Sequence, residues 1–163
     1  MVGKVKAAVD ARQSTQTLIV GRTDAAAVEG FPAALDRASA YLEAGADILF
    51  VEAPRTQSDM RATVERFGSR VPLVANMVEG GHTPILSCEQ LGAIGFKLVI
   101  APGAMVRVLI PAAEALLASL KRTGTSQDVR ERMVTLAGVN ERVGLASAIE
   151  DARRYDPLVQ GVE

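Results

Sequence analysis

The sequence has 163 residues, enough for one domain, and 48% of them are hydrophobic while only 4% are aromatic. With 18 basic and 19 acidic residues the net charge is −1, so the chain lacks the basic stripe and the stacking aromatics typical of nucleic-acid-binding proteins. The single cysteine has no partner for an intrachain disulfide, and no long uncharged apolar run or signal-peptide core is found. We therefore expect a soluble, cytoplasmic protein that acts on a small molecule, without a membrane segment.

Strands alternate with helices along most of the chain. Short runs of apolar, often β-branched residues predict strands at residues 17–20, 48–51, 71–75 and 96–101. Helical spacing of apolar positions predicts helices at residues 2–12, 31–44, 56–68 and 105–120, with a short one between them that starts at the capping box of Ser87 and Gln90 and ends near Gly92 or Gly95. This order indicates parallel βα units, with strands apolar enough to be covered on both faces.

The last part of the chain is predicted to be purely helical. The helix of residues 105–120 ends at Gly124, and two further helices are expected at about 126–137 and 141–154. Residues 157–163 are expected to form a loose tail. The strands before Gly124 fit either a small open doubly wound sheet or part of a (β/α)₈ barrel. The segment after the first strand, Gly21-Arg22-Thr23-Asp24, is not a glycine-rich phosphate loop, which argues against a nucleotide-binding open sheet.

Polar side chains follow the first two predicted strands. Arg22 and Asp24 come where the first strand ends, and Glu52 comes directly after the second. Because parallel α/β folds carry their chemistry at the carboxyl ends of strands, Arg22 is a candidate clamp for a substrate carboxylate or phosphate, with Asp24 orienting it. Glu52 is a candidate base or hydroxyl-positioning group. Both carboxylates could instead serve only as ion-pair partners of arginine.

The loop after the third predicted strand is the richest in chemistry. Asn76 offers a donor and an acceptor, Glu79 offers a carboxylate, and Gly80 with Gly81 lets backbone amides approach a ligand closely. The alternative is a tight turn that only needs the glycines. His82, the one histidine, is expected to be an exposed loop residue, and Cys88, inside a capping box, a structural cysteine. Ligand spacing of the zinc type is absent.

Four segments together resemble the isocitrate lyase/phosphoenolpyruvate mutase superfamily: GRTDA at residues 21–25, ASAYLEAGADILFVEA at 38–53, ANMVEGGHTP at 75–84 and LGAIGFK at 91–97. The resemblance extends from about Lys4 to Tyr155. It is nearest to the short-chain branch that includes 2-methylisocitrate lyase, dimethylmalate lyase, oxaloacetate decarboxylase and carboxyphosphonoenolpyruvate mutase-like proteins.

The resemblance implies an Mg²⁺-dependent lyase on a (β/α)₈ barrel that cleaves a C–C bond of a 2-hydroxy di- or tricarboxylate through an enolate. It implies that Arg22 binds a carboxylate of the substrate, that Glu52 lies in the metal or hydroxyl environment, and that Asn76 with Glu79 completes the substrate pocket. Taken with the residues themselves, we expect the substrate, a small carboxylate, to be bound by Arg22, Asp24, Asn76 and Gly80, and we expect Glu52 and Glu79 to be catalytic. Gly21 stands where the superfamily usually has alanine, which leaves the turn intact.

The sequence also departs from the superfamily pattern. The metal-binding aspartates and the Lys-x-Cys-Gly-His loop with the catalytic cysteine are missing, so we expect no principal metal ligand on this chain. Four strands are predicted where a barrel needs eight and about 250 residues. We therefore expect the carboxyl half of the barrel at residues 1–124, followed by helices at 125–156 that resemble those exchanged between subunits.

A half-barrel leaves sheet edges and an apolar inner face uncovered, so we expect a homo-oligomer or a second barrel half as partner. Two function classes follow: a lyase that works once the barrel is complete, or a catalytically silent half-barrel, either a scaffold or a truncated product. Oxaloacetate decarboxylase or phosphonomutase activity is a further alternative.

Overall fold

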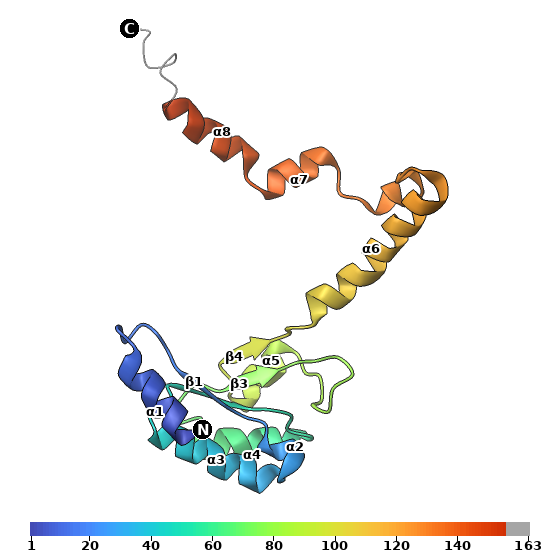
Figure 1. The fold of residues 1–163 in the computed structure, drawn as a ribbon. Helices are drawn as coiled ribbons and strands as arrows, with labels where there is room; N and C mark the ends of the chain where they lie inside the picture. The colour runs from blue at the N-terminus through green and yellow to red at the C-terminus, as the bar shows by residue number, and fades with distance from the viewer. Residues whose placement is uncertain (156–163) are drawn as a thin grey trace. The chain divides into compact units, whose positions relative to one another are not determined.

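The computed structural model describes residues 1–155, and the chain divides into two compact units at residues 108 and 109 (Figure 1). The loose tail expected at 157–163 lies outside the described residues. Unit 1 is an α/β unit. Its elements are α1 (Val2–Ala11), β1 (Val20–Thr23), α2 (Ala25–Val28), α3 (Phe31–Glu43), β2 (Ile48–Val51), α4 (Gln57–Phe67), β3 (Val74–Asn76), α5 (Cys88–Ile94), β4 (Leu98–Ile100) and the start of α6 (Ala104–Thr123).

All strand pairs in the described chain are parallel, and strands adjacent in sequence are adjacent in space. β1 pairs with β2, and β3 pairs with β4. A parallel bridge between Leu49 and Leu73 links the two pairs. This order confirms the predicted succession of βα units, because each helical crossover returns the chain to the next position in the same array.

The main hydrophobic core of unit 1 lies between the strands and the helices that follow them. Figure 1 shows α3 and α4 together on one side of the strands. Side chains from alternate strand positions meet the helices there, since successive residues of a strand point to opposite faces. The most deeply buried large residues of this core are Leu49, Met60, Phe67, Leu73 and Leu91.

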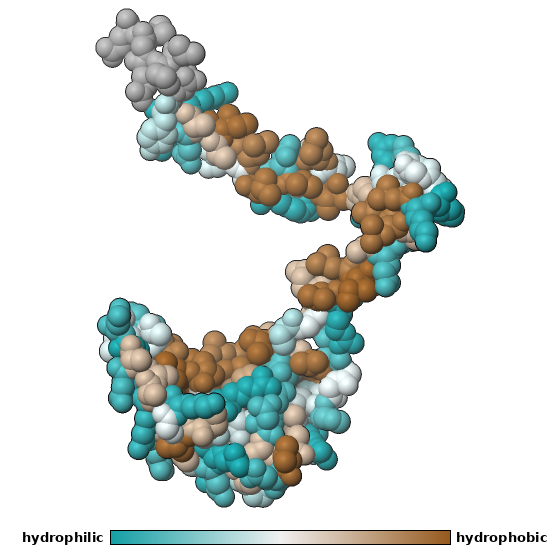
Figure 2. All heavy atoms as spheres, viewed as in Figure 1, coloured by the Kyte–Doolittle hydropathy of each residue, from teal (hydrophilic) through white to brown (hydrophobic). Residues whose placement is uncertain are grey.

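The opposite face of the strands is apolar but poorly covered. Ile48, Phe50 and Val74 form a small separate cluster, while Val20, at the β1 edge, is exposed. All of β4 is exposed as well. Figure 2 shows apolar side chains gathered along the side of unit 1 away from α3 and α4. The prediction that all strands are buried on both faces is therefore wrong for β1 and β4, which have helices on one side only.

Helix ends in unit 1 follow the sequence signals closely. Ser87 and Gln90 form the predicted capping box of α5, and α5 ends before Gly95. Thr56 and Asp59 form a second box at the start of α4, where each satisfies a backbone amide of the other. Gly45 follows α3 with φ of 101°, a left-handed conformation that glycine adopts at little cost.

Strand boundaries differ from the predicted ones by a few residues. β1 runs over Val20–Thr23 instead of 17–20, because the Asp47 carboxylate accepts hydrogen bonds from the Ile19 amide (2.8 Å) and from Arg12 (2.7 Å). The Ile19 amide is thus satisfied by a side chain rather than by a neighbouring strand. β3 and β4 are likewise shorter than predicted: β3 starts later and ends one residue beyond the predicted run, and β4 lies inside it. As a consequence Arg22 lies within a strand and Asn76 ends one.

Unit 2 is helical, but its helices are divided differently from the prediction. The expected helix 126–137 is a 3₁₀ helix, η1 (Gln127–Arg132), followed by a break and α7 (Leu136–Arg142). Asp128 bonds to Arg122 (2.7 Å), which holds η1 against the end of α6, and Thr135 caps α7. Gly144, with φ of 70°, separates α7 from α8 (Leu145–Arg154), so the expected helix at 141–154 starts later.

Between residues 1 and 155, no helix combines the length and apolarity that crossing a bilayer requires.

Candidate active site

Three neighbouring strands bring polar groups to one level at their carboxyl ends. Thr23 pairs with Val51, which places Asp24 beside Glu52. Leu49 bridges Leu73, and three residues further along both strands Glu52 stands beside Asn76. Arg22 lies opposite Phe50 on the face of the strands that α3 and α4 leave uncovered. Arg22, Asp24, Glu52 and Asn76 thus form a row of polar side chains across the strand ends, which we call the row. Parallel α/β folds carry catalytic residues at this edge.

Arg22 is the centre of this row. Its Nε and Nη2 donate to the two carboxylate oxygens of Asp24 at 3.1 and 2.8 Å, and Nη2 lies 3.2 Å from Glu52 Oε2. The guanidinium also lies over the Phe50 ring, 4.7 Å from its centre. The hydrogen bond to Asp24 raises the pKa of Arg22 and lowers the pKa of Asp24. Within the described residues Nη1 makes no hydrogen bond, and it is the side of Arg22 open to a ligand.

Glu52 and Asn76 form the second contact of the row. Asn76 Nδ2 donates to both carboxylate oxygens of Glu52, at 3.3 and 3.2 Å. The other end of the amide, Asn76 Oδ1, is buried and finds no hydrogen-bond partner among residues 1–155. A buried acceptor without a donor costs free energy, so it marks a place where a bound molecule could donate.

Backbone strain occurs directly beside Glu52. Ala53 has φ of 56°, the left-handed region, which non-glycine residues adopt only at a cost of about 1–3 kcal/mol. Such strain persists where surrounding structure imposes it, and it is frequent at functional sites. Nothing in the sequence around Ala53 indicated it.

A pocket of about 160 Å³ opens beside Glu52 and Asn76. The loop after β3 supplies its other wall, including Gly81, His82 and Thr83. His82 is exposed, as predicted, yet it faces the same pocket as the Glu52–Asn76 pair. Cys88 is exposed at the start of α5 and lines no part of this pocket.

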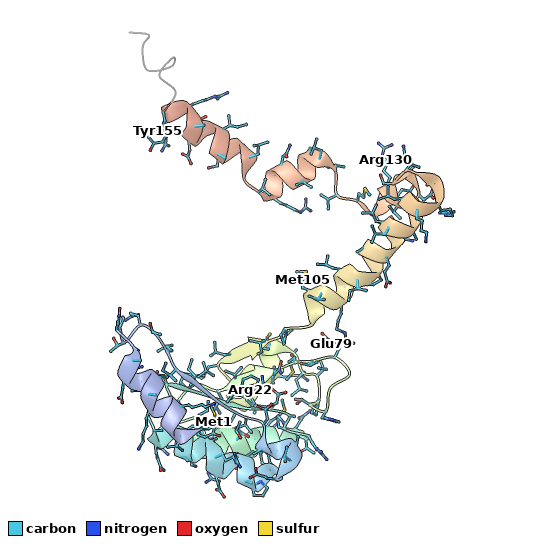
Figure 3. All side chains as sticks on the ribbon, in the orientation of Figure 1. Met1, Arg22, Glu79, Met105, Arg130 and Tyr155 are labelled. Atoms are coloured by element: carbon cyan, nitrogen blue, oxygen red, sulfur yellow. The ribbon has the colours of Figure 1, made fainter. Side chains whose placement is uncertain are left out.

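The structure places Glu79 and Gly80 apart from the row. The Glu79 carboxylate lies 3.4 Å from Arg107 at the start of α6, and Arg107 also donates to the Glu79 carbonyl. Figure 3 labels both Glu79 and Arg22, the residue at the centre of the row. Gly80 has φ of 77° with open space around it, which is the geometry of a tight turn. The arrangement brings together Arg22, Asp24, Glu52 and Asn76 of the six predicted site residues. The catalytic role of Glu79 stays a prediction.

A metal centre does not form from the described side chains alone. Among residues 1–155, no three His, Cys, Asp or Glu side chains lie close enough to hold an ion. The two carboxylates of the row, Asp24 and Glu52, are both engaged with Arg22. The donor set of residues 1–155 therefore does not fit an Mg²⁺ site without further ligands.

Sequence reasoning missed two contacts that shape the site. Phe50 lies under Arg22, and its position two residues before Glu52 on the same strand was the available signal. Arg107 pairs with Glu79 from 28 residues away, and no local pattern predicts that contact.

The Arg22–Asp24 pair predicts a small, acid-sensitive contribution to stability. Because the folded-state pKa of Asp24 is lowered, this contribution is present above the unfolded pKa of about 3.9 and is lost as pH falls through the folded value. Both side chains are about half exposed, so we expect Asp24→Asn to lower the free energy of unfolding by about 0.5 kcal/mol at neutral pH. Urea unfolding at pH about 7 and about 3 measures this, and a difference that is as large at the lower pH would contradict it.

Comparison with known proteins places the chain in a family. A family model described as phosphoenolpyruvate phosphomutase matches residues 1–121. The chain belongs to the phosphoenolpyruvate mutase family. The 2,3-dimethylmalate lyase of Eubacterium barkeri is 41% identical over 157 residues, which are 95% of this chain and 53% of that protein. The 2-methylisocitrate lyase of Aeropyrum pernix is 40% identical over 144 residues, 88% of this chain and 46% of that protein.

The chain also shares its fold with solved structures of this superfamily. A crystal structure of 2,3-dimethylmalate lyase, described as a phosphoenolpyruvate mutase/isocitrate lyase superfamily member, matches with a TM-score of 0.83 at 28% identity. The match covers 95% of this chain and 54% of that one. The resemblance to this superfamily is confirmed, and the chain spans about half the length of the relatives it matches.

Proposed function

We propose that this chain forms the carboxyl half of a (β/α)₈ barrel and supplies the substrate-binding wall of a lyase. The substrate class is a 2-hydroxy di- or tricarboxylate such as 2-methylisocitrate, and the reaction is cleavage of a C–C bond. The observation that carries the proposal is the row of Arg22, Glu52 and Asn76, in which one guanidinium nitrogen and one buried amide oxygen are left for a ligand. The names of the relatives, 2,3-dimethylmalate lyase and 2-methylisocitrate lyase, support the same class of activity.

Each residue of the row has a distinct task in this proposal. Arg22 Nη1 grips a substrate carboxylate, since a guanidinium is a rigid donor fork matched to carboxylate oxygens. In the bound substrate, Asn76 Oδ1 accepts a hydrogen bond from the 2-hydroxyl group. As the C–C bond breaks, the hydroxyl group turns its one hydrogen toward Glu52, which is held by Arg22 and Asn76 and takes that proton. The hydroxyl oxygen becomes a carbonyl, and the bonding electron pair leaves on the other fragment as an enolate, which is then protonated.

The resemblance implies that Mg²⁺ would stabilise the negative charge of that enolate when bound. Because the described side chains do not form a metal centre, its principal ligands have to come from outside residues 1–155. A second barrel half, in another chain or another copy, is therefore part of the proposal. It would also cover the exposed apolar face at Val20, Leu98 and Ile100.

The proposed domain organisation follows from the same reasoning. Residues 1–124 would form the half-barrel, and the helices of 125–156 would be exchanged between subunits. The large apolar side chains of α7 and α8 support this, because Leu136, Val139, Leu145 and Ile149 are all exposed in the described structure. An exchange partner would bury them.

A catalytically silent half-barrel is the second candidate. It is favoured by one observation, the lack of a metal-ligand cluster among residues 1–155. In that case the row would still bind a small carboxylate but would have no chemistry to perform. The two candidates differ in turnover, not in binding.

A chimera separates the two candidates. We would replace the matched segment of the Eubacterium barkeri 2,3-dimethylmalate lyase with this chain, so that a complete barrel is present, and assay it with Mg²⁺ on 2,3-dimethylmalate, 2-methylisocitrate and oxaloacetate. The lyase proposal expects cleavage of at least one hydroxy acid. A folded chimera that turns over none of the three favours the silent half-barrel, and turnover of oxaloacetate alone favours the decarboxylase alternative.

A further inference from the structure

The row carries more negative than positive charge, which disfavours binding of a ligand with two carboxylates. Arg22 contributes one positive charge, whereas Asp24 and Glu52 contribute two negative charges within 3.2 Å of it. The hydrogen bond from Arg22 lowers the pKa of Asp24, so that carboxylate stays ionised at every physiological pH. A second substrate carboxylate beside this row would meet a net charge of about −1, and like charges at short range repel.

His82 is the group placed to compensate this charge. It lines the pocket of about 160 Å³ that also touches Glu52 and Asn76. Its imidazole makes no hydrogen bond and no ion pair within the described part of the chain, whereas Arg107, which is near in the fold, is engaged with Glu79. Arg55 lines a different pocket, together with Asp59.

The loop geometry holds His82 in place. The Gly81 amide donates to the Val78 carbonyl at 3.0 Å and closes the turn that precedes the histidine. A Cβ at Gly81 would stand 3.0 Å from that carbonyl oxygen, so the turn is compact at this point. The charged groups that face the pocket are then Glu52 from the β2 end and His82 from the loop, with the Glu79–Arg107 pair on the flank of the loop.

We propose that His82 binds the second carboxylate of the substrate and makes the site selective for dicarboxylates over monocarboxylates. The inference rests on the proposed function and adds the residue that sets the substrate's charge. Arg22 holds one carboxylate, Asn76 Oδ1 accepts the hydroxyl hydrogen bond, and His82 holds the other carboxylate on the loop side of the pocket.

Ligand binding to the intact chain tests this without any requirement for turnover. L-Malate and L-lactate differ by one carboxylate, and malate is largely a dianion by pH about 6. We expect the chain to prefer malate over lactate at least about fivefold at pH about 6, because only malate brings a second carboxylate to His82. Calorimetric or NMR titration measures both affinities, and the single histidine gives imidazole proton signals of its own that report contact directly.

Substitutions make the test specific to His82. His82→Gln should lose the preference for malate while still binding lactate, and His82→Lys should keep it because a lysine ammonium also pairs with a carboxylate. Arg55→Gln removes an exposed cation from the neighbouring pocket and should behave like the wild type. Circular dichroism checks that each variant is folded.

The possible outcomes separate this inference from the proposed function. If malate binds and shifts the Asn76 side-chain amide signals while His82→Gln leaves the affinity for malate and the preference over lactate unchanged, the role of His82 is wrong and the proposed site stands. If neither malate nor lactate binds the folded wild type, the carboxylate site itself is overturned, and the role of His82 falls with it.

Discussion

Phe67→Ala is expected to lower the free energy of unfolding by about 3–5 kcal/mol, a large part of the total stability of a small domain. Phe67 ends α4, is completely buried and belongs to the main core between the strands and helices of unit 1. Removing its ring leaves a cavity that the surrounding strands can fill only in part. Urea unfolding followed by circular dichroism measures the change.

The matched control for Phe67 is Val28→Ala. Val28 ends the short helix α2 and its side chain is 83% exposed, so its truncation should change stability by no more than about 0.5 kcal/mol. Equal effects of the two substitutions would show that the core of unit 1 does not lie where the structure places it.

Arg22→Ala is expected to reduce kcat/KM of the chimera with its hydroxy-acid substrate by roughly 100-fold or more, which corresponds to about 2.7 kcal/mol. The substitution removes the proposed clamp for the substrate carboxylate, and it also leaves Glu52 without its cation. Arg22→Lys should restore little, because an ammonium makes neither the two-pronged contact with Asp24 nor the flat contact with Phe50.

Arg66→Ala is the control for a general effect of losing an arginine. Arg66 is also ion-paired, to Asp36 at 2.8 Å, and it also lies over a phenylalanine ring, 5.5 Å from the centre of Phe67. It is not part of the row of polar strand ends, so its loss should leave kcat/KM within about twofold. A comparable loss of activity in both variants would show that the effect of Arg22→Ala is not specific to the proposed carboxylate site.

The succession of elements in unit 1 could be predicted from the sequence because its signals are local. Capping residues at Thr56 and Ser87 and the glycine after α3 mark ends where the chain itself satisfies its backbone groups. The strand boundaries could not be predicted, because they depend on contacts between distant residues. The Asp47 carboxylate takes the Ile19 amide from 28 residues away and so delays β1.

In unit 2, too, the helix boundaries set by neighbouring residues were predicted, and those set by more distant contacts were not. The apolar periodicity of α6 predicted a helix that ends at Gly124. The break between η1 and α7 was not predicted, because it reflects the attraction of Asp128 to Arg122 and Ser119 on the preceding helix. Thr135 then provides a new cap where the pattern suggested an uninterrupted helix.

The part of the candidate site that follows from strand order could be predicted from the sequence. Parallel strands that are adjacent in sequence and in space carry Arg22, Glu52 and Asn76 to one edge, and the sequence alone suggested that edge. Glu79 does not join them, because Arg107 on a later helix pairs with it. The place of His82 on the pocket wall depends on the turn at Gly81, which has no unique signature in the sequence.

A crystal structure of the chain with L-malate tests the central claim, that these strand ends form the wall of a hydroxy-carboxylate site. We expect one carboxylate against Arg22 Nη1, the hydroxyl donating to Asn76 Oδ1, and Glu52 still bonded to Asn76 Nδ2. Malate bound elsewhere in a crystal where this pocket is open to solvent, or malate that leaves Arg22 and Asn76 untouched, would contradict it.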